Sequence, residues 1–439
     1  MISLRVPLLV AVLGLPAVFV PFSGWWLLGT VGLVTVLVGL DLLLAASIRD
    51  LRCDRSGDTQ VRAGSQATVT LTVTNDGVRP LNGLIRDAWV PSAGATSTPS
   101  AIDPVVIEPG HSLAIQTELT PRQRGARPAV RVTIRSYGPL GLAYRQTTRR
   151  SSRRLTPPWT LRVLPPFDSR RFLPEKLSRL RIIDGQVVTR GRGQGTEFDS
   201  LREYVVGDDI RSIDWRATAR AEHVMVKTWR PERDRRVLCV LDTGRTSAAR
   251  VADEPRLDAG IDAALLLAAL ASHAGDRVDL LAVDTEVRAS VTTGSHRTLL
   301  PTLVDAMATL EPVLYETDFG RVVSEVLYLA RRRALVVLFT TLEPGALGEG
   351  LMPVLPQLLS RHRVIVASVR DPSLDALAAG RGSLAAIYTA AAAEKAIAGR
   401  DRVRAALSRY GVHVVEAPPA TFASAVADAY LDLKAAGRL

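Results

Sequence analysis

The pattern of hydrophobic and charged positions begins with a long apolar stretch. No charged residue occurs among the 35 residues from Val6 to Leu40, and Pro21-Phe22-Ser23-Gly24 interrupts this run. One helix of that length would reach roughly 52 Å, well beyond the ~30 Å hydrocarbon core of a bilayer. The pattern therefore predicts two membrane-spanning helices, about Leu4–Val20 and Trp25–Ile48. A cleaved signal peptide followed by one anchor is the alternative.

Basic residues flank the two predicted spans on the same side. Arg5 precedes the first span, Arg49, Arg52 and Arg55 follow the second, and the connecting turn carries no charge. Because positive charges favour the cytoplasmic side, we expect a protein of the inner or plasma membrane with both termini in the cytoplasm. Asp41 lies inside the second span, where we expect it to snorkel to the interface. A functional intramembrane carboxylate is the alternative.

Residues 51–150 have the pattern of a β domain. Thr68–Thr74 alternates with period two and is rich in β-branched residues. Leu113–Leu119 and Ala129–Ile134 are further strand candidates next to turn residues. Strands about every ten residues without a helical stretch are typical of a small immunoglobulin-like β-sandwich.

From residue 235 to the end, apolar strands alternate with helices. Val237–Leu241 and Ala334–Phe339 are continuous apolar runs, and Leu257–Ser272 is a helix rich in alanine and leucine. This alternation predicts a mainly parallel sheet with helices on both faces. Ligands of such sheets bind beyond the carboxyl ends of the strands, where Asp242 and Thr340-Thr341 lie.

Charge and cysteine content narrow the classes of protein. Lys and Arg number 55 against 44 Asp and Glu, a net charge of +11, and the excess is concentrated between the β domain and the α/β region. No aromatic residues are interleaved with the basic ones, so we expect no nucleic-acid partner. The run Arg149–Arg154 faces anionic lipid or is a solvated linker. The two cysteines exclude a disulfide scaffold and a cysteine-ligated zinc site.

A dense block from Gly195 to Arg220 contains E-F, L-R-x-Y, G-D, R-x-I-D-W and A-x-A-R elements. The block resembles the signature of bacterial domain-of-unknown-function-58 proteins. The family layout also matches the whole chain: a transmembrane helical hairpin at 1–50, a β-sandwich at 51–150, and a basic linker with the signature block at 151–234. The resemblance implies that 235–439 is an α/β open sheet of von Willebrand factor type A (Rossmann-like) type.

The resemblance also implies a class of function. Members of this family are often encoded beside MoxR-type AAA+ ATPases, which suggests a membrane-anchored cytoplasmic adaptor that docks such an ATPase for envelope-related assembly. The expected activity is protein binding and not catalysis. The residues expected to dock the partner are those of the signature block: Glu197, Phe198, Arg202, Tyr204, Gly207, Asp208, Arg211, Asp214, Trp215 and Arg220.

The acidic residues of the block allow a chemical alternative. Paired carboxylates can hold divalent cations and neighbouring arginines can hold phosphate, so a metal-dependent hydrolase is the rival hypothesis. Alternating charges at short spacing favour mutual ion pairing instead. Trp215 is expected to be a core anchor. No Ser/His/Asp or Cys/His arrangement emerges, and the six histidines are scattered.

The resemblance to a type A domain implies a candidate Mg²⁺ site, the only cofactor expected here. Its ligands map to Asp242, Thr246 and Thr317. Gly244 replaces a serine ligand, and Thr341 stands where an aspartate is expected. We therefore expect a retained fold with a degenerate metal-ion-dependent adhesion site. Compensation by Asp318 or Glu343 is the alternative.

Overall fold

The protein consists of two compact units in this computed structural model, Met1–Pro166 and Phe167–Leu439. The structure describes residues 3–18, 23–96, 103–190, 197–205, 208–230, 235–252, 254–292 and 296–439. The chain is therefore multi-domain, as its sequence predicts. The predicted end of the β domain at residue 150 is too early, because a strand that completes this unit follows at 160–164.

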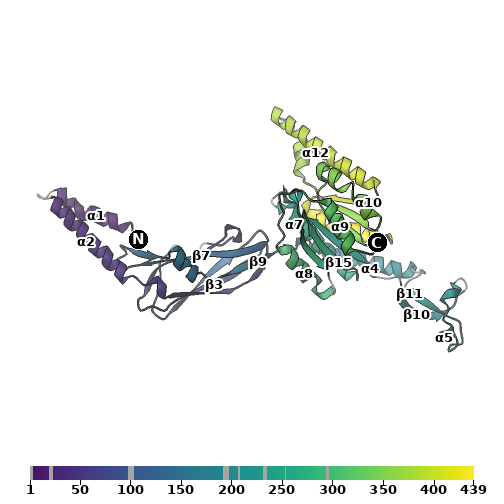
Figure 1. Ribbon diagram of the computed structural model, residues 1–439, viewed down its shortest axis with the longest axis horizontal. Helices are drawn as coiled ribbons and strands as arrows, with labels where there is room; N and C mark the ends of the chain where they lie inside the picture. Colours follow the sequence, from purple (N-terminus) through teal and green to yellow (C-terminus); the bar gives the residue numbers. More distant parts are fainter. Residues whose placement is uncertain are drawn as a thin grey trace. The chain divides into compact units, whose positions relative to one another are not determined.

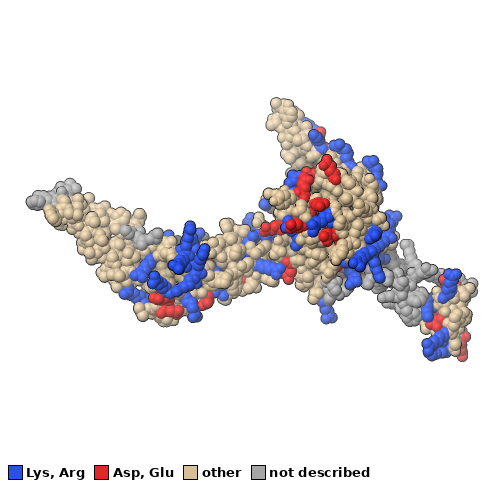
Figure 2. Space-filling model, viewed as in Figure 1, with Lys and Arg blue, Asp and Glu red and all other residues tan. Residues whose placement is uncertain are grey.

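Two helices open the first unit (Figure 1). They are α1 (Arg5–Gly14), continued by the short η1 (Leu15–Val18), and α2 (Ser23–Leu44). The segment Gly24–Asp50 is long and apolar enough to cross a membrane. By contrast, the 10 residues of α1 reach about 15 Å, half of a bilayer core. Figure 2 shows almost no charged side chains over these helices, whereas basic side chains gather on the adjoining β region.

Two β-sheets form the rest of the first unit. One has the antiparallel order β1 (Leu51–Gly57), β3 (Ala67–Asn75), β6 (Ser112–Leu119). The other has the order β2 (Gln60–Arg62), β9 (Thr160–Leu164), β7 (Gly125–Tyr137), β4 (Leu81–Trp89), β5 (Val105–Ile107), with β8 (Tyr144–Gln146) paired to β7. Side chains of both sheets share one hydrophobic cluster, which makes this region a two-layered β structure.

The basic run before the second unit is a helix and not a linker. Helix α3 (Arg149–Leu155) begins with a capping box in which the side chains of Thr148 and Ser151 bond each other's backbone. Leu155 is buried in the hydrophobic cluster, and Ser152 donates to the carbonyl of Val132 at 3.0 Å. Of the two alternatives for Arg149–Arg154, the solvated linker does not hold, because one apolar side chain and one serine fix the helix to β7.

The second unit is built on a six-stranded sheet (Figure 1). Its order is β16 (Val287–Thr292), β15 (Arg277–Val283), β12 (Arg236–Asp242), β17 (Leu335–Phe339), β18 (Arg363–Val369), β19 (His413–Ala417). All neighbours are parallel except β16, which is antiparallel to β15. This confirms the mainly parallel sheet, since its central strands are the continuous apolar runs.

Helices cover both faces of this sheet. Alternate side chains of β12 point to opposite sides: Leu238 and Val240 join a cluster with one set of helices, whereas Leu241 lies against Gly260 of α7. The first set comprises α9 (Phe319–Leu329), α10 (Leu355–Leu359) and α12 (Leu384–Arg409), and the second α7 (Arg256–His273) and α13 (Pro419–Ala435). The other helices of this unit are η5 (Asp168–Phe172), α4 (Leu173–Arg190), α6 (Arg245–Ala248), α8 (His296–Ala308), η7 (Ala346–Leu351) and α11 (Ser373–Ala378).

Helix α4 belongs to the α/β unit, although its residues lie within the predicted linker region. Lys176 donates to the Asp428 carboxylate of α13 at 2.8 and 2.9 Å, and Arg179 donates to the same group at 2.8 Å. The Lys176 side chain is buried, which its carboxylate partner makes possible. The signature block then forms a separate small sheet of β10 (Glu197–Glu203) and β11 (Met225–Arg230), with η6 (Ile210–Ser212) and α5 (Trp215–Thr218) between the strands.

Cys239 is buried in its unit, and Cys53 is partly buried in the other. Cys239 is in the central strand β12, and burial raises the pKa of its thiol to about 12. Burial also raises the pKa of Cys53 in β1 to about 12. Both thiols therefore stay protonated at neutral pH.

Candidate functional site

The candidate site lies at the carboxyl edge of the parallel sheet. Asp242 is the last residue of β12, and its neighbours in the sheet are the ends of β15 and β17. Thr340 and Thr341 directly follow β17. Because parallel strands end together at this edge, polar residues from distant parts of the chain meet there.

The Asp242 carboxylate is buried and accepts hydrogen bonds at both oxygens. Its Oδ1 accepts from the Gly244 amide at 2.8 Å and from the Thr317 hydroxyl. Its Oδ2 accepts from the hydroxyls of Thr340 at 2.6 Å and Thr246 at 3.4 Å. Burial raises the pKa of Asp242, and these donors oppose that rise. The structure thus brings together Asp242, Thr246 and Thr317 as expected from the sequence, and adds Thr340.

Steric crowding explains why position 244 is a glycine. A Cβ atom at this position would lie 2.1 Å from the Thr317 hydroxyl, far inside van der Waals contact. Thr317 therefore occupies the space that a serine side chain would need. The Thr317 hydroxyl can bond Asp242 only because residue 244 has no side chain.

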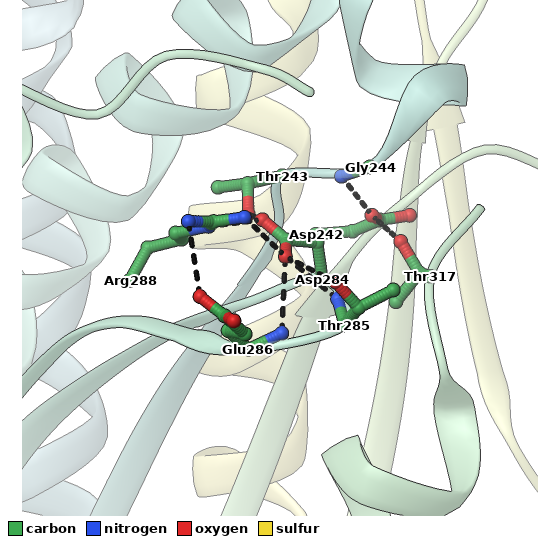
Figure 3. Close-up of polar contacts among 8 residues, drawn as sticks. All are labelled: Asp242, Thr243, Gly244, Asp284, Thr285, Glu286, Arg288 and Thr317. Atoms are coloured by element: carbon green, nitrogen blue, oxygen red, sulfur yellow. Dashed lines mark hydrogen bonds and ion pairs between the residues drawn. The ribbon is translucent and has the colours of Figure 1, made fainter. Parts of the chain in front are cut away.

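A second buried carboxylate, Asp284, lies beside the first (Figure 3). Asp284 directly follows β15, whereas Asp242 is the last residue of β12, and Thr243 donates to Asp284 Oδ2 at 2.8 Å. Arg288 donates to both oxygens at 2.7 and 3.0 Å, and the amides of Thr285 and Glu286 donate to Oδ1. Burial raises the pKa of Asp284, but these donors outweigh it and lower the pKa to about 2. Sequence reasoning missed Asp284, although its place after a strand was visible.

This donor set does not fit a magnesium ion. Mg²⁺ requires near-octahedral oxygen ligands and usually takes carboxylates. Here the Asp242 oxygens are occupied by donors, and the Asp284 oxygens are used by Arg288 and backbone amides. Among the described residues, no group of three His, Cys, Asp or Glu side chains could hold a metal ion.

The two residues that could have compensated are used elsewhere. Asp318 caps α9 by accepting from the Arg321 amide at 3.1 Å. Glu343 is half-exposed and lies 3.9 Å from the Arg245 guanidinium. Arg245 itself donates to Glu316 at 2.8 Å. These carboxylates therefore add no ligand to the Asp242 cluster.

The described acidic residues of the signature block serve as caps and ion-pair partners. Asp208 accepts from Arg202 at 2.7 Å, which raises the pKa of that guanidinium. Asp214 caps α5 through the Arg216 and Ala217 amides and lies 3.1 Å from the Lys227 ammonium, and these bonds lower its pKa.

For the other residues of the block that are expected to dock a partner, the structure gives exposure or backbone pairing but no side-chain partner that bears on docking. Arg211 and Arg220 are exposed, and Tyr204 bonds through its backbone to Val224. Glu197 and Phe198 pair through the backbone of β10. Gly207 lies outside the described residues.

Exposed apolar side chains mark the same block. Trp215 is 66% exposed, so the expectation of a core anchor is wrong. The reason is that α5 is a single short turn, held by the Asp214 cap and not by burial of its tryptophan. Ile210, Val205 and Val224 are exposed as well. Together with Trp215, these residues form what we call the apolar surface of the block.

In the first unit, Asp41 is a buried hydrogen-bond acceptor. Its carboxylate accepts from the backbone amides of Leu140 at 2.7 Å, Leu142 at 2.8 Å and Ala143 at 2.7 Å. Gly138 permits this approach, because a Cβ atom there would lie 2.2 Å from Asp41 Oδ1. The snorkelling expectation is therefore wrong. The three amides lie about 100 residues later in the chain, so the local sequence around Asp41 could not predict this contact.

The fold and this site define a multi-domain protein whose α/β unit carries a hydroxyl-rich carboxylate cluster at the carboxyl edge of its sheet. The family model described as "Protein of unknown function DUF58" matches residues 200–413 of the chain. The match begins within β10 and covers most of the α/β unit.

Relatives with curated sequences are themselves uncharacterized. "Uncharacterized protein Rv1480" of Mycobacterium tuberculosis and "Uncharacterized protein Mb1516" of Mycobacterium bovis are each 27% identical over 183 residues, 41% of this chain and 56% of theirs. The chain thus matches little more than half the length of these relatives.

Two of the solved structures that match are similar to about a quarter of the chain. The CARDB domain of a Pyrococcus furiosus protein, described in complex with di-metal ions, is 13% identical, with a TM-score of 0.18 over 26% of this chain and 87% of that chain. A FixG-related protein of Vibrio parahaemolyticus is 10% identical, with a TM-score of 0.16 over 22% of this chain and 91% of that chain. TM-scores of this size carry no argument about function.

Proposed function

We propose that this protein is a membrane-anchored cytoplasmic adaptor that docks a protein partner, a MoxR-type AAA+ ATPase, for envelope-related assembly. The observation that carries the proposal is the apolar surface of the signature block. Trp215 is 66% exposed and Ile210 is 68% exposed on a small two-stranded element. Exposed aromatic and aliphatic side chains are typical of protein interfaces.

The chemistry of the block supports docking over catalysis. Asp208 and Asp214 are engaged by Arg202, Lys227 and backbone amides, so they hold the shape of the block. A metal-dependent hydrolase would need carboxylates that converge on a common point. No observation favours that rival, and the ion pairs among these residues favour a structural use of their charges.

The proposed anchoring follows from the flanking charges. We propose that α1 with η1 and α2 form a two-span hairpin, with Arg5 and Arg49 on the cytoplasmic side. The β region is then an immunoglobulin-like spacer, and the α/β unit a type A-like domain without a functional magnesium site. Reporters fused at Leu439 should be active in the cytoplasm only; activity outside the inner membrane would refute this topology.

A capture experiment tests the docking proposal. Full-length protein is solubilised from membranes of cells that co-express a MoxR-type ATPase, and the ATPase recovered with it is quantified. We expect recovery with the wild type and a loss of roughly 10-fold or more with Trp215→Ala, the size expected for a central interface aromatic. Tyr410→Ala removes another exposed aromatic as the matched control. No ATPase with the wild type, or equal recovery with Trp215→Ala, would refute the proposal.

A further inference from the structure

Arginine side chains gather where α2 meets the β region of the first unit. They come from the start of α1, the segment after α2, the loop before β4, strand β8 and helix α3. Seven of them are exposed, and Arg145 is half-buried. These residues, which we call the arginine collar, are Arg5, Arg49, Arg79, Arg145, Arg149, Arg150, Arg153 and Arg154.

Two members of the collar hold the last turn of α2. Arg145 donates to the carbonyl of Leu42 at 3.1 Å, and Arg79 donates to the carbonyl of Leu43. The last carbonyls of a helix have no partner within it and carry a partial negative charge, so guanidinium groups stabilise this end. A guanidinium has five N–H donors, and each of these bonds uses one. The two arginines are therefore fixed in place and keep donors for a further acceptor.

The start of α1 and helix α3 lie at the same end of the first unit. A Cβ atom at Gly141 would lie 2.7 Å from Arg5 Nη1, so this guanidinium lies against the loop whose amides bond Asp41. In α3, Arg154 donates to the carbonyl of Arg49. The collar therefore draws together segments from both ends of the first unit.

The length of α2 sets the level of the collar in a bilayer. A 22-residue helix is about 33 Å long, close to the ~30 Å hydrocarbon core. With α2 spanning the membrane as proposed, groups that bond its last turn lie among the lipid headgroups. Val78, beside Arg79, is 92% exposed, and Leu140, whose amide bonds Asp41, is 47% exposed. Apolar side chains next to arginines suit this interfacial level.

The collar has no carboxylate partners in the described part of the chain. Elsewhere in the same unit, Arg52 pairs with Asp54 and Arg55 pairs with Asp87. Asp41, the buried carboxylate at this end of α2, is satisfied by backbone amides and not by an arginine. The charges of the collar are therefore left for an anion from outside the chain.

We propose that the arginine collar binds the phosphate groups of anionic phospholipids. Guanidinium groups form bidentate hydrogen bonds with phosphate oxygens, and each arginine near an anionic membrane surface adds to the attraction. Two exposed carboxylates, Asp50 and Asp76, lie at the loop that carries Arg79, and the eight arginines outnumber them. The inference rests on the proposed anchor: lipid is favoured over an acidic protein because the collar is fixed to the end of the spanning helix.

Native mass spectrometry of full-length protein released from nanodiscs tests this proposal. The nanodiscs contain phosphatidylcholine and phosphatidylglycerol in equal amounts, and the lipid of each class that stays bound is counted. We expect at least about 5-fold more phosphatidylglycerol than phosphatidylcholine on the wild type. A triple variant with Arg149→Gln, Arg150→Gln and Arg153→Gln removes three exposed charges of α3 and should lower this ratio about 3-fold or more.

A matched variant controls for net charge. Arg331→Gln, Arg332→Gln and Arg333→Gln together remove the same charge from an exposed run of the α/β unit and should leave the lipid ratio unchanged. Equal retention of both lipids by the wild type would overturn the proposal. An equal fall of the ratio in both triple variants would also overturn it, because the preference would then follow net charge and not the collar.

Two further measurements separate this inference from the proposed function. Alkaline extraction of membranes should leave the wild type in the membrane fraction; its release would refute the proposed anchor and this inference with it. Retention without a preference for phosphatidylglycerol would refute the lipid site alone. Capture of the ATPase should be equal for the wild type and the α3 variant. Loss of capture with an unchanged lipid ratio would assign the collar to an acidic surface of the protein partner and overturn the lipid assignment.

Discussion

Replacing Asp41 with alanine should detach the end of α2 from the β region of the first unit. The Asp41 carboxylate is fully buried and is the acceptor for the amides of Leu140, Leu142 and Ala143. Alanine removes both oxygens and leaves three amides without that acceptor. Two of these hydrogen bonds are buried, so water does not easily replace the lost acceptor.

The size of the effect follows from these contacts. A hydrogen bond to a charged group contributes roughly 1.5–3 kcal/mol, and an orphaned buried amide costs about 1–3 kcal/mol. Because the three bonds share one carboxylate, they are not additive, and we expect a loss of about 3–5 kcal/mol in the free energy of local opening. At 1.4 kcal/mol per factor of ten, this corresponds to roughly 100-fold faster exchange or more. Gly138→Ala should act in the same direction, since its Cβ would meet the carboxylate at 2.2 Å.

Hydrogen exchange measured by mass spectrometry on full-length protein in nanodiscs checks this prediction. Peptides that contain residues 140–143 should lose protection in Asp41→Ala, while peptides from the α/β unit stay unchanged. Asp76→Asn removes an exposed carboxylate of the same unit and is the matched control. If the amides of Leu142 and Ala143 remain as protected in Asp41→Ala as in the wild type, the carboxylate is not their acceptor and the reasoning is refuted.

Three further predictions concern the α/β unit. Asp262→Asn should stabilise the protein by about 1–3 kcal/mol at pH 7, measured by urea unfolding. Burial raises the pKa of Asp262 to about 6, so the wild type loses stability as the pH rises from about 4 to 6. Asparagine carries no charge and still accepts the hydrogen bond from the Ser169 hydroxyl. Asp284, with its pKa lowered to about 2, contributes stability above pH 4 that is lost as the pH falls towards 2; Asp284→Asn should cost about 1–2 kcal/mol at pH 7, with a difference that narrows in acid. Gly244→Ser should lower stability by about 1–3 kcal/mol by displacing Thr317, and thermal melts should show no added response to Mg²⁺; a magnesium-dependent gain would contradict the steric argument.

The α/β unit could be predicted because its strongest signals are local. Val237–Leu241 and Ala334–Phe339 are apolar on both sides, as strands buried on both faces must be, and they are the central strands β12 and β17. The placing of Thr317 beside Asp242 came from the resemblance to a type A domain, since 75 residues separate them.

The predictions that failed share a physical origin, because each depended on contacts that the local sequence does not show. Trp215 was expected in a core because tryptophan is large and apolar, but a one-turn helix offers it no core. A solvated linker was one alternative for Arg149–Arg154, because six residues rich in arginine show no apolar pattern; the buried Leu155 that holds α3 in place follows directly after them. Asp41 depends on amides about 100 residues away, and a contact of that kind leaves no trace in a local pattern.

The two thiols, one buried and one partly buried, have a practical consequence for experiments on this protein. Cys53 and Cys239 are the only cysteines of the chain, and both remain protonated far above neutral pH. Maleimide reagents attack the thiolate and need access to it. A pair of cysteines, one introduced on the surface of each unit, can therefore be labelled with fluorophores or spin probes in the otherwise natural sequence, and the distance between the two units can be followed in solution.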